Sequence, residues 1–252
     1  MTSIVKKIGL ICYHIIPAAF LFFVIGEISI GSIFDFLFLM IAFYALYEIG
    51  YIYNDTETVK TENNPTLRLS DDEIAYYNKR KINIYIDRCL IFLLLTFVPI
   101  VMFHHKYLLL GFIACILELF IFQLYNNIRG RFSIPVFFLL ETFKYLPFVI
   151  CFYDRINSII LGVVMLIYAI PNTIERLSFP RYDIKLMMKL LPSRQSLLIF
   201  RGGYNITIAI ILYCLDLLKL FPNSFFLLFF FLAFFRGFAL IAEYKKGTVL
   251  SR

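Results

Sequence analysis

The residues best suited to chemistry lie where an apolar run ends, in the segment YEIGYIYNDTETVKTENNPTLRLS (47–70). If the helix of that run continues into the polar part, Asp55, Thr58 and Glu62 are spaced three and four residues apart and share one face. Glu57 lies about a third of a turn from Thr58. Carboxylates on one helix face can hold Mg²⁺, which prefers oxygen ligands and often bridges to substrate phosphates. The segment therefore predicts a Mg²⁺ site with Asp55, Glu62 and Glu57 as ligands.

Cationic side chains follow the same carboxylates. Lys60 lies within the segment, and Arg68 comes after Pro65. Charged donors of this kind bind phosphate strongly, and arginine does so with two parallel hydrogen bonds. We therefore expect Lys60 and Arg68 to contact phosphate beside the metal.

The rest of the chain is apolar enough to place these residues at a membrane. Of its 252 residues, 61% are hydrophobic, and several apolar runs reach the roughly 20 residues that a bilayer-spanning helix needs. Continuous runs of this kind indicate helices rather than the short alternating strands of a barrel. We expect an all-α polytopic membrane bundle, a single domain over 1–252, with two larger cytoplasmic loops at 54–81 and 176–195. The eight expected spans are 8–25, 30–53, 82–103, 107–125, 132–153, 157–175, 196–217 and 222–244.

The placement of basic residues predicts the orientation. Most lysines and arginines outside the spans fall in one set of segments, whereas the opposite loops hold only Lys106, Arg155 and Lys219. Positive loops face the cytoplasm, so both termini are expected there, in an integral protein of a prokaryotic plasma membrane. The formal charge of +7 fits anionic lipid or phosphate as partners. No basic soluble segment exists to bind nucleic acid. The five cysteines lie inside expected spans without metal-binding spacing.

Ionisable residues inside the expected spans gather towards the cytoplasmic half. Charges at this depth are costly and mark functional or paired sites. Intrahelical or interhelical ion pairs and snorkelling explain many single cases, but the shared bias indicates a polar cavity that opens to the cytoplasm. Glu48, Arg88, Arg201 and Glu243 fall within two or three turns of the cytoplasmic side. The full set of ionisable residues in the spans is Glu48, Asp87, Arg88, Glu118, Glu141, Lys144, Arg201, Asp216, Arg236 and Glu243, with Asp35 near the outer edge.

The two larger loops show local helix signals. SDDE at 70–73 fits a capping box, in which Ser70 caps a helix and Glu73 reaches back to it. In the second loop, RYDIKLMMKLL (181–191) alternates basic and apolar residues at helical spacing, which predicts an amphipathic helix at the membrane surface.

At this point the residues resemble a known family. The stretch YNDTETVKTENNPTLRLS resembles the first acidic motif of the UbiA-type prenyltransferase superfamily, N-D-x-x-D-x-x-x-D followed by an N-P-x-R-like segment. Asn54 and Asp55 match, Glu62 replaces the last aspartate, and Thr58 stands where the middle aspartate is expected. LYNNIRGRF, which contains Tyr125, resembles the tyrosine and basic residues after the family's fourth span.

The second acidic motif of the family departs from its pattern here. At the end of the sixth expected span the chain reads YAIPNTIERLSFPRYDIK. Asn172 and Arg176 have the separation of the D-x-x-x-D carboxylates but not their charge, and Glu175 is the carboxylate nearby on the helix. The family usually has nine spans, so a C-terminal span is absent from the expected topology.

The resemblance implies a function and assigns roles. Helices would surround a cavity open to the cytoplasm, and Mg²⁺ would hold an isoprenoid diphosphate donor for prenyl transfer to an acceptor. Asp55, Asn54 and Glu62 become the catalytic candidates. The other substrate-binding candidates are Lys60, Arg68, Arg176 and Arg181 for phosphate, with Asn172, Glu175 and Tyr125. Two alternatives stay open: phosphoribosyl transfer to a polyprenyl phosphate, and a non-catalytic relative or small transporter.

Overall fold

The computed structural model describes residues 8–26, 28–61, 67–103, 108–128, 130–219 and 225–245, and every regular element within these ranges is helical. Seven helical segments there are long and apolar enough to cross a membrane. An all-α integral membrane protein is therefore confirmed at this level. The segments are Ile8–Ile25, Ile30–Lys60, Asp71–Val101, Leu108–Asn127, Ser158–Leu177, Arg194–Leu217 and Phe225–Ala242.

The remaining expected span, 132–153, is not one continuous helix. It is divided into α6 (Ser133–Phe143) and α7 (Leu146–Ile150), with a turn at Lys144 and Tyr145. Pro147 explains the break, because it has no N–H to donate to the carbonyl four residues earlier and its ring crowds that carbonyl. Eight expected spans thus become seven continuous helices and one divided helix.

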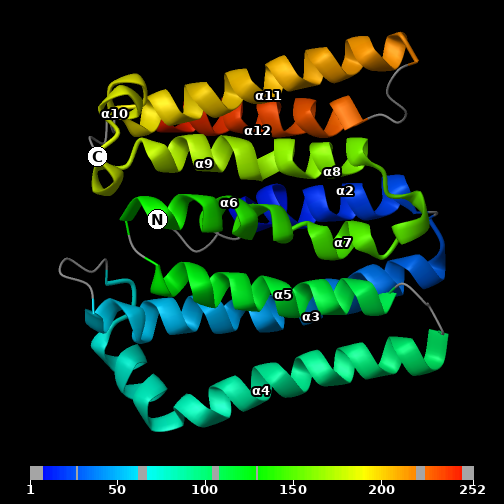
Figure 1. Cartoon of the computed structure of the whole chain (residues 1–252), viewed down its shortest axis with the longest axis vertical. Helices are drawn as coiled ribbons and strands as arrows, with labels where there is room; N and C mark the ends of the chain where they lie inside the picture. Colours follow the sequence, from blue (N-terminus) through cyan, green and yellow to red (C-terminus); the bar gives the residue numbers. More distant parts are fainter. Residues whose placement is uncertain are drawn as a thin grey trace. The chain divides into compact units, whose positions relative to one another are not determined.

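Helix contacts divide the chain into two compact units. Residues 25–156 form one, here called the middle unit. Residues 1–24 and 157–252 form the other, here called the terminal unit. The helices of both are labelled in Figure 1.

In the middle unit, α3 (Ile30–Thr56) is the shared element. It packs against α4 (Asp71–Phe103), α5 (Leu108–Asn127) and α7, and α5 also packs against α6. Its apolar face, including Leu39, Ala42 and Phe43, is buried. Close approach of α5 to α7 depends on Gly111, because a Cβ there would lie 2.9 Å from the Pro147 carbonyl oxygen.

The terminal unit contains an almost continuous helix beside a helix pair. α8 (Ser158–Val164), a π-helical turn η5 (Met165–Ala169) and α9 (Ile170–Leu177) follow one another without a break. The wide turn precedes Pro171, which cannot donate the bond that a regular α-helix needs there. α11 (Arg194–Leu217) packs against α12 (Phe225–Lys245).

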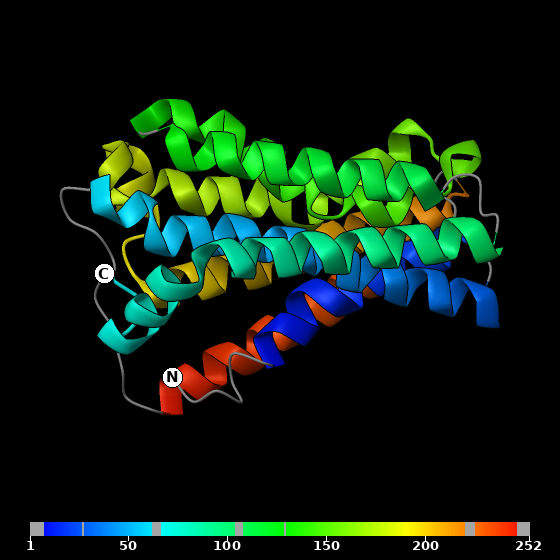
Figure 2. The same ribbon diagram turned by 90° about the horizontal axis from the view of Figure 1, so that it is seen from below.

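The N-terminal segment belongs to the terminal unit. It consists of a π-helical turn η1 (Ile11–Ile15) and α2 (Ile16–Ile25). Tyr13 meets Phe235 edge-on at 5.0 Å between ring centroids, and Phe20 contacts Phe225. The segment therefore runs beside α12, as the view in Figure 2 shows.

The helix boundaries at the two larger loops are partly different from those predicted. α3 ends at Thr56 and a 3₁₀ turn, η2 (Thr58–Thr61), follows, so the α-helical face proposed to carry Asp55 and Thr58 together does not continue. The capping box at the start of α4 is confirmed, because the Ser70 amide donates to Glu73 and the Glu73 amide donates to Ser70. The helix expected at 181–191 is shorter and occupies η6 (Pro180–Tyr182) and α10 (Lys185–Leu190).

Candidate functional site

Asp55 lies in the last turn of α3, within the middle unit, and is held by neighbouring donors. Its Oδ1 accepts hydrogen bonds from Asn54 Nδ2 at 3.0 Å and from Arg68 Nη1 at 3.3 Å. Three residues predicted for one site are therefore together. Arg68 and Asp55 form an ion pair, and Asn54 donates to the same carboxylate oxygen.

Glu57 has a different set of partners. One carboxylate oxygen accepts from Lys60 at 2.9 Å, and the other accepts from Lys81 and from the Tyr77 hydroxyl, each at 2.7 Å. Lys81 and Tyr77 belong to α4, so this carboxylate joins the end of α3 to the neighbouring helix. Glu57 and Lys60, predicted for metal and phosphate, stabilise a helix contact.

The described carboxylates of this motif contact cationic side chains. Both oxygens of Glu57 are occupied by cations and a hydroxyl, and Asp55 faces Arg68. Within the described ranges, no three His, Cys, Asp or Glu side chains come together as a possible metal site. Glu62, the third predicted ligand, lies outside those ranges. The Mg²⁺ assignment stays a prediction.

Tyr125 also lies in the middle unit, on α5. Its ring packs against Phe137 of α6 with centroids 5.6 Å apart. The next residue, Asn126, is buried and donates to the Gly50 carbonyl of α3 at 3.1 Å. The structure therefore gives this part of α5 helix-packing contacts.

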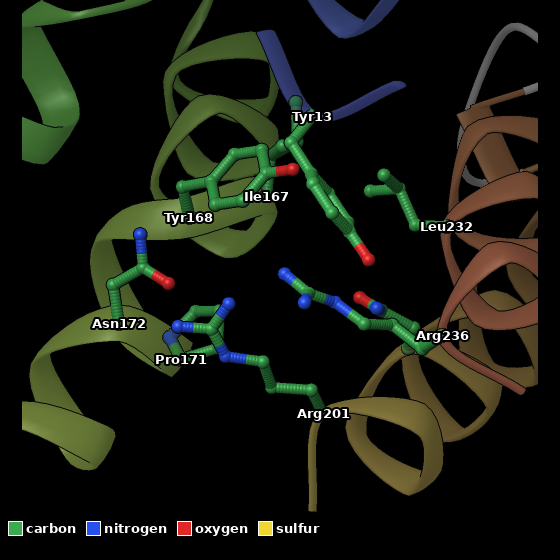
Figure 3. A pocket seen from close by; sticks show the side chains of 9 residues that line it. Tyr13, Ile167, Tyr168, Pro171, Asn172, Arg201, Leu232 and Arg236 are labelled. Atoms are coloured by element: carbon green, nitrogen blue, oxygen red, sulfur yellow. The ribbon is translucent and has the colours of Figure 1, made fainter. Parts of the chain in front are cut away.

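The terminal unit contains a small pocket lined by polar side chains from four helical segments (Figure 3). Arg201 reaches it from α11 and Arg236 from α12, and Figure 3 shows the two guanidinium groups extending towards the same space. The remaining lining residues are Tyr13, Ile167, Tyr168, Pro171, Asn172, Asn205 and Leu232.

Arg236 carries the unbalanced charge of this pocket. Its side chain is buried, and its guanidinium carbon lies 3.7 Å from the centroid of the Tyr13 ring, which is a close cation–π contact. Within the described part of the chain, no carboxylate forms an ion pair with it. A buried cation without a carboxylate is costly, so the ring compensates only part of its lost hydration.

Arg201 is balanced by Glu175. The Glu175 carboxylate of α9 pairs with the Arg201 guanidinium, and both side chains are largely buried. The Oδ1 atom of Asn205, one turn further along α11, is buried and has no hydrogen-bond partner among the described residues. Counting Arg201, Arg236 and Glu175 together, the pocket has an excess of one positive charge.

The space between these side chains holds about one water molecule. A larger anion therefore enters only when side chains move.

Of the residues predicted from the segment after the sixth span, some lie at the pocket and others lie outside it. Asn172 lines the pocket, and Glu175 contacts it through Arg201. Arg176 lies over the Phe179 ring at 5.4 Å, and the exposed Arg181 donates to the Tyr182 hydroxyl and stacks on that ring. Neither Arg176 nor Arg181 lines the pocket in this structure.

Both arginines of the pocket, Arg201 and Arg236, were missing from the predicted site. Their signal was present in the sequence, since both are arginines inside apolar spans. The pattern did not show that α11 and α12 pack together and bring both guanidinium groups to one place.

Comparisons with protein-family models, with curated proteins and with solved structures find no match for this chain.

Proposed function

We propose that this chain is an integral membrane transferase of the UbiA type, which moves a prenyl group from an isoprenoid diphosphate to an acceptor. The observation that supports this best is the excess positive charge in the pocket of Arg201 and Arg236. A positive charge without a counter-charge is costly inside a membrane-spanning unit, and binding of an anionic substrate would neutralise it. Phosphate suits the donors, because guanidinium groups bind it in a bidentate manner.

The lipid part of the substrate follows from the position of the pocket. It lies inside a unit made of apolar spanning helices, and Ile167 and Leu232 line it beside the arginines. An isoprenoid chain could stay in the apolar phase while its phosphate meets the arginines. Tyr13 and Tyr168 present aromatic rings in the same pocket, and such rings stabilise nearby positive charge.

The reaction needs stabilisation of a leaving diphosphate. Negative charge grows on its oxygen when the allylic carbon–oxygen bond breaks, and fixed cationic donors lower the energy of that state. Arg236 is the principal candidate because it contacts the Tyr13 ring and forms no ion pair with a carboxylate among the described residues. Arg201 contributes when its ion pair with Glu175 is weakened.

A second candidate function is phosphoribosyl transfer to a polyprenyl phosphate. One observation favours it: where the family motif would place a second pair of carboxylates, this chain provides Asn172 and a Glu175 neutralised by Arg201. A site with more arginines and fewer free carboxylates suits two phosphorylated substrates. The reaction class, a transfer to or from a lipid phosphate, is common to both candidates.

We further propose that the pocket opens to the cytoplasm of a prokaryotic cell and that both termini lie on that side. The excess of lysine and arginine in the segments next to these helix ends supports this orientation.

To test this, membranes that contain the protein are incubated with prenyl diphosphate or with phosphoribosyl diphosphate. The lipid products are then identified by mass spectrometry. We expect a new product with one donor, and a decrease of about 10²-fold for Arg236→Gln, the order of effect of losing one transition-state donor. Arg88→Gln is the matched control, because Arg88 is also a spanning-helix arginine but pairs with Glu48. No lipid product from either donor, or equal turnover by Arg236→Gln, would contradict the proposal.

A further inference from the structure

A second polar cluster lies inside the middle unit, apart from the residues used above. It contains Glu118 of α5, Glu141 of α6, Lys144 at the break between α6 and α7, and Tyr47 of α3. All four are buried, with exposed fractions of 1%, 5%, 7% and 5%, respectively. Lys144 Nζ lies 3.6 Å from Glu141 Oε1 and 5.5 Å from the centroid of the Tyr47 ring.

Glu118 is the unusual member of this cluster. Neither of its carboxylate oxygens has a hydrogen-bond partner among the described residues. Phe122, one turn further along α5, packs on the Tyr47 ring at 5.1 Å between centroids, and Lys144 lies over the same ring. Glu118 is therefore on the part of α5 that lies close to the ion pair. It lies near the middle of α5, about 15 Å from either helix end. At that depth the carboxylate cannot extend into the polar region of a bilayer.

The charges of the cluster require one proton. Two carboxylates and one ammonium would leave a net negative charge in a buried, apolar place, which costs several kcal/mol. A single bound proton makes the cluster neutral. We propose that Glu118, Glu141 and Lys144 form a buried one-proton site, in which one of the two carboxyl groups carries a proton and Lys144 pairs with the one that is ionised.

The single proton gives the site two arrangements of equal charge. In the observed one, Lys144 faces Glu141, and the proton is on Glu118. In the other, the proton leaves the Glu118 oxygen and binds a Glu141 oxygen, and Lys144 turns to Glu118. The Lys144–Glu141 separation of 3.6 Å is longer than a tight charged hydrogen bond of about 2.8 Å. Lys144 is the C-cap residue of α6, at the break between α6 and α7.

A hydroxyl pair leads from the cluster along α3. Tyr47 packs edge-on against Tyr51, one turn later on α3, with ring centroids 5.1 Å apart. Tyr51 is more exposed, and Asp55 follows one turn later towards the end of the helix. This spacing gives a route by which the proton exchanges with solvent.

Other titratable groups surround the site on the side away from Tyr51. The thiol of Cys115, one turn before Glu118 on α5, interacts with Glu118 and with the thiol of Cys151, and Cys151 interacts with Asp35 of α3. Thiols are weak proton donors and acceptors, so the glutamates remain the groups that hold the proton.

Infrared spectra of the purified protein at neutral pH test the proposal, because a protonated carboxyl has its own C=O band. We expect Glu118→Gln and Glu141→Gln each to remove the same single band, since either substitution leaves one carboxylate paired with Lys144. Lys144→Met should add one band, because both acids must then be neutral. Glu48→Gln, which changes an exposed carboxylate paired with Arg88, should alter nothing. Tyr51→Phe should slow the D₂O shift of the band, and Tyr53→Phe, on another face of α3, should not.

The variants also show whether protonation of Glu118 depends on Glu141. If Glu141→Gln retains the band, Glu118 is protonated independently of Glu141 and the one-proton site is wrong. If Glu118→Gln leaves the spectrum unchanged, Glu118 is ionised and the proposal is wrong. Should one glutamine variant fail to fold, the other variant and Lys144→Met still decide. All readings are independent of substrate and of transferase activity.

Discussion

Glu57 shows how a residue predicted for metal binding can have a structural role. It matches the acidic composition of a Mg²⁺ motif, yet Lys60, Lys81 and Tyr77 occupy its oxygens. The sequence could identify the carboxylate but not its partners, because Lys81 and Tyr77 lie on the next helix. The partners of Asp55, Asn54 and Arg68, belong to the same short segment as Asp55, so the sequence alone brings these three residues near one another.

At the residue scale, Glu57→Gln is expected to lower stability. It removes the charge that holds two lysines, and partly exposed pairs of this kind contribute up to about 1 kcal/mol each. Thermal unfolding in detergent should show a lower midpoint than for the wild type. Glu48→Gln is the control, since Glu48 is half-exposed and pairs with a single arginine, Arg88, among the described residues. An unchanged midpoint for Glu57→Gln, with loss of a stabilising effect of added Mg²⁺, would instead assign Glu57 to a metal site.

At the scale of elements, the sequence predicted the existence of helices better than their continuity. Seven apolar runs became continuous helices because each contains enough apolar residues to span a bilayer. The run 132–153 was predicted as one helix, although it contains Pro147 and a mid-span lysine. The first span agrees with its predicted bounds. The α-helix predicted to continue beyond Asp55 does not, because η2 begins within a turn of that residue.

Gly111 tests how closely α5 and α7 pack. A Cβ at this position would lie 2.5 Å from Cys151 Sγ and 2.9 Å from the Pro147 carbonyl oxygen. We expect Gly111→Ala to destabilise the protein by about 1–3 kcal/mol, the usual cost of overpacking. Chemical or thermal unfolding in detergent measures this.

Gly162→Ala is the matched control for that substitution. Gly162 is also in a spanning helix, but no atom of the neighbouring described residues would lie within 4 Å of a Cβ added there. Alanine at this position should be neutral or stabilise the helix by up to about 1 kcal/mol. Equal effects of the two alanines would show that α5 and α7 do not pack at Gly111.

At the scale of the whole molecule, the expected single bundle consists of two compact units. The sequence has no linker between them, and residues 1–24 join the unit formed by 157–252. Such a partition depends on which helices pack together, and hydrophobic periodicity carries little information about that. For the same reason the sequence singled out Asn172 and Glu175 but did not join them to Arg201 and Arg236.

The orientation of the chain is a prediction at this scale. With the N-terminus in the cytoplasm, Asp154 lies on the outer face and Lys189 on the cytoplasmic face if α6 and α7 together complete a crossing; without that crossing the two faces are exchanged. In a background without native cysteines, Lys189→Cys should react with a membrane-impermeant thiol reagent from the cytoplasmic side, and Asp154→Cys from the outer side. The reversed pattern, with Asp154→Cys reacting from the cytoplasmic side and Lys189→Cys from the outer side, would contradict the eight-crossing topology.

The central claim is that the Arg201–Arg236 pocket binds the phosphate of a lipid. Its most direct test is a binding titration of the protein in nanodiscs with farnesyl diphosphate and with the uncharged alcohol farnesol. We expect the diphosphate to bind the wild type and Arg88→Gln alike, and Arg236→Gln about 10–100-fold more weakly, because a charged hydrogen bond contributes about 1.5–3 kcal/mol. Farnesol should not displace the diphosphate. Equal affinity for the alcohol and the diphosphate, or unchanged binding by Arg236→Gln, would contradict the account.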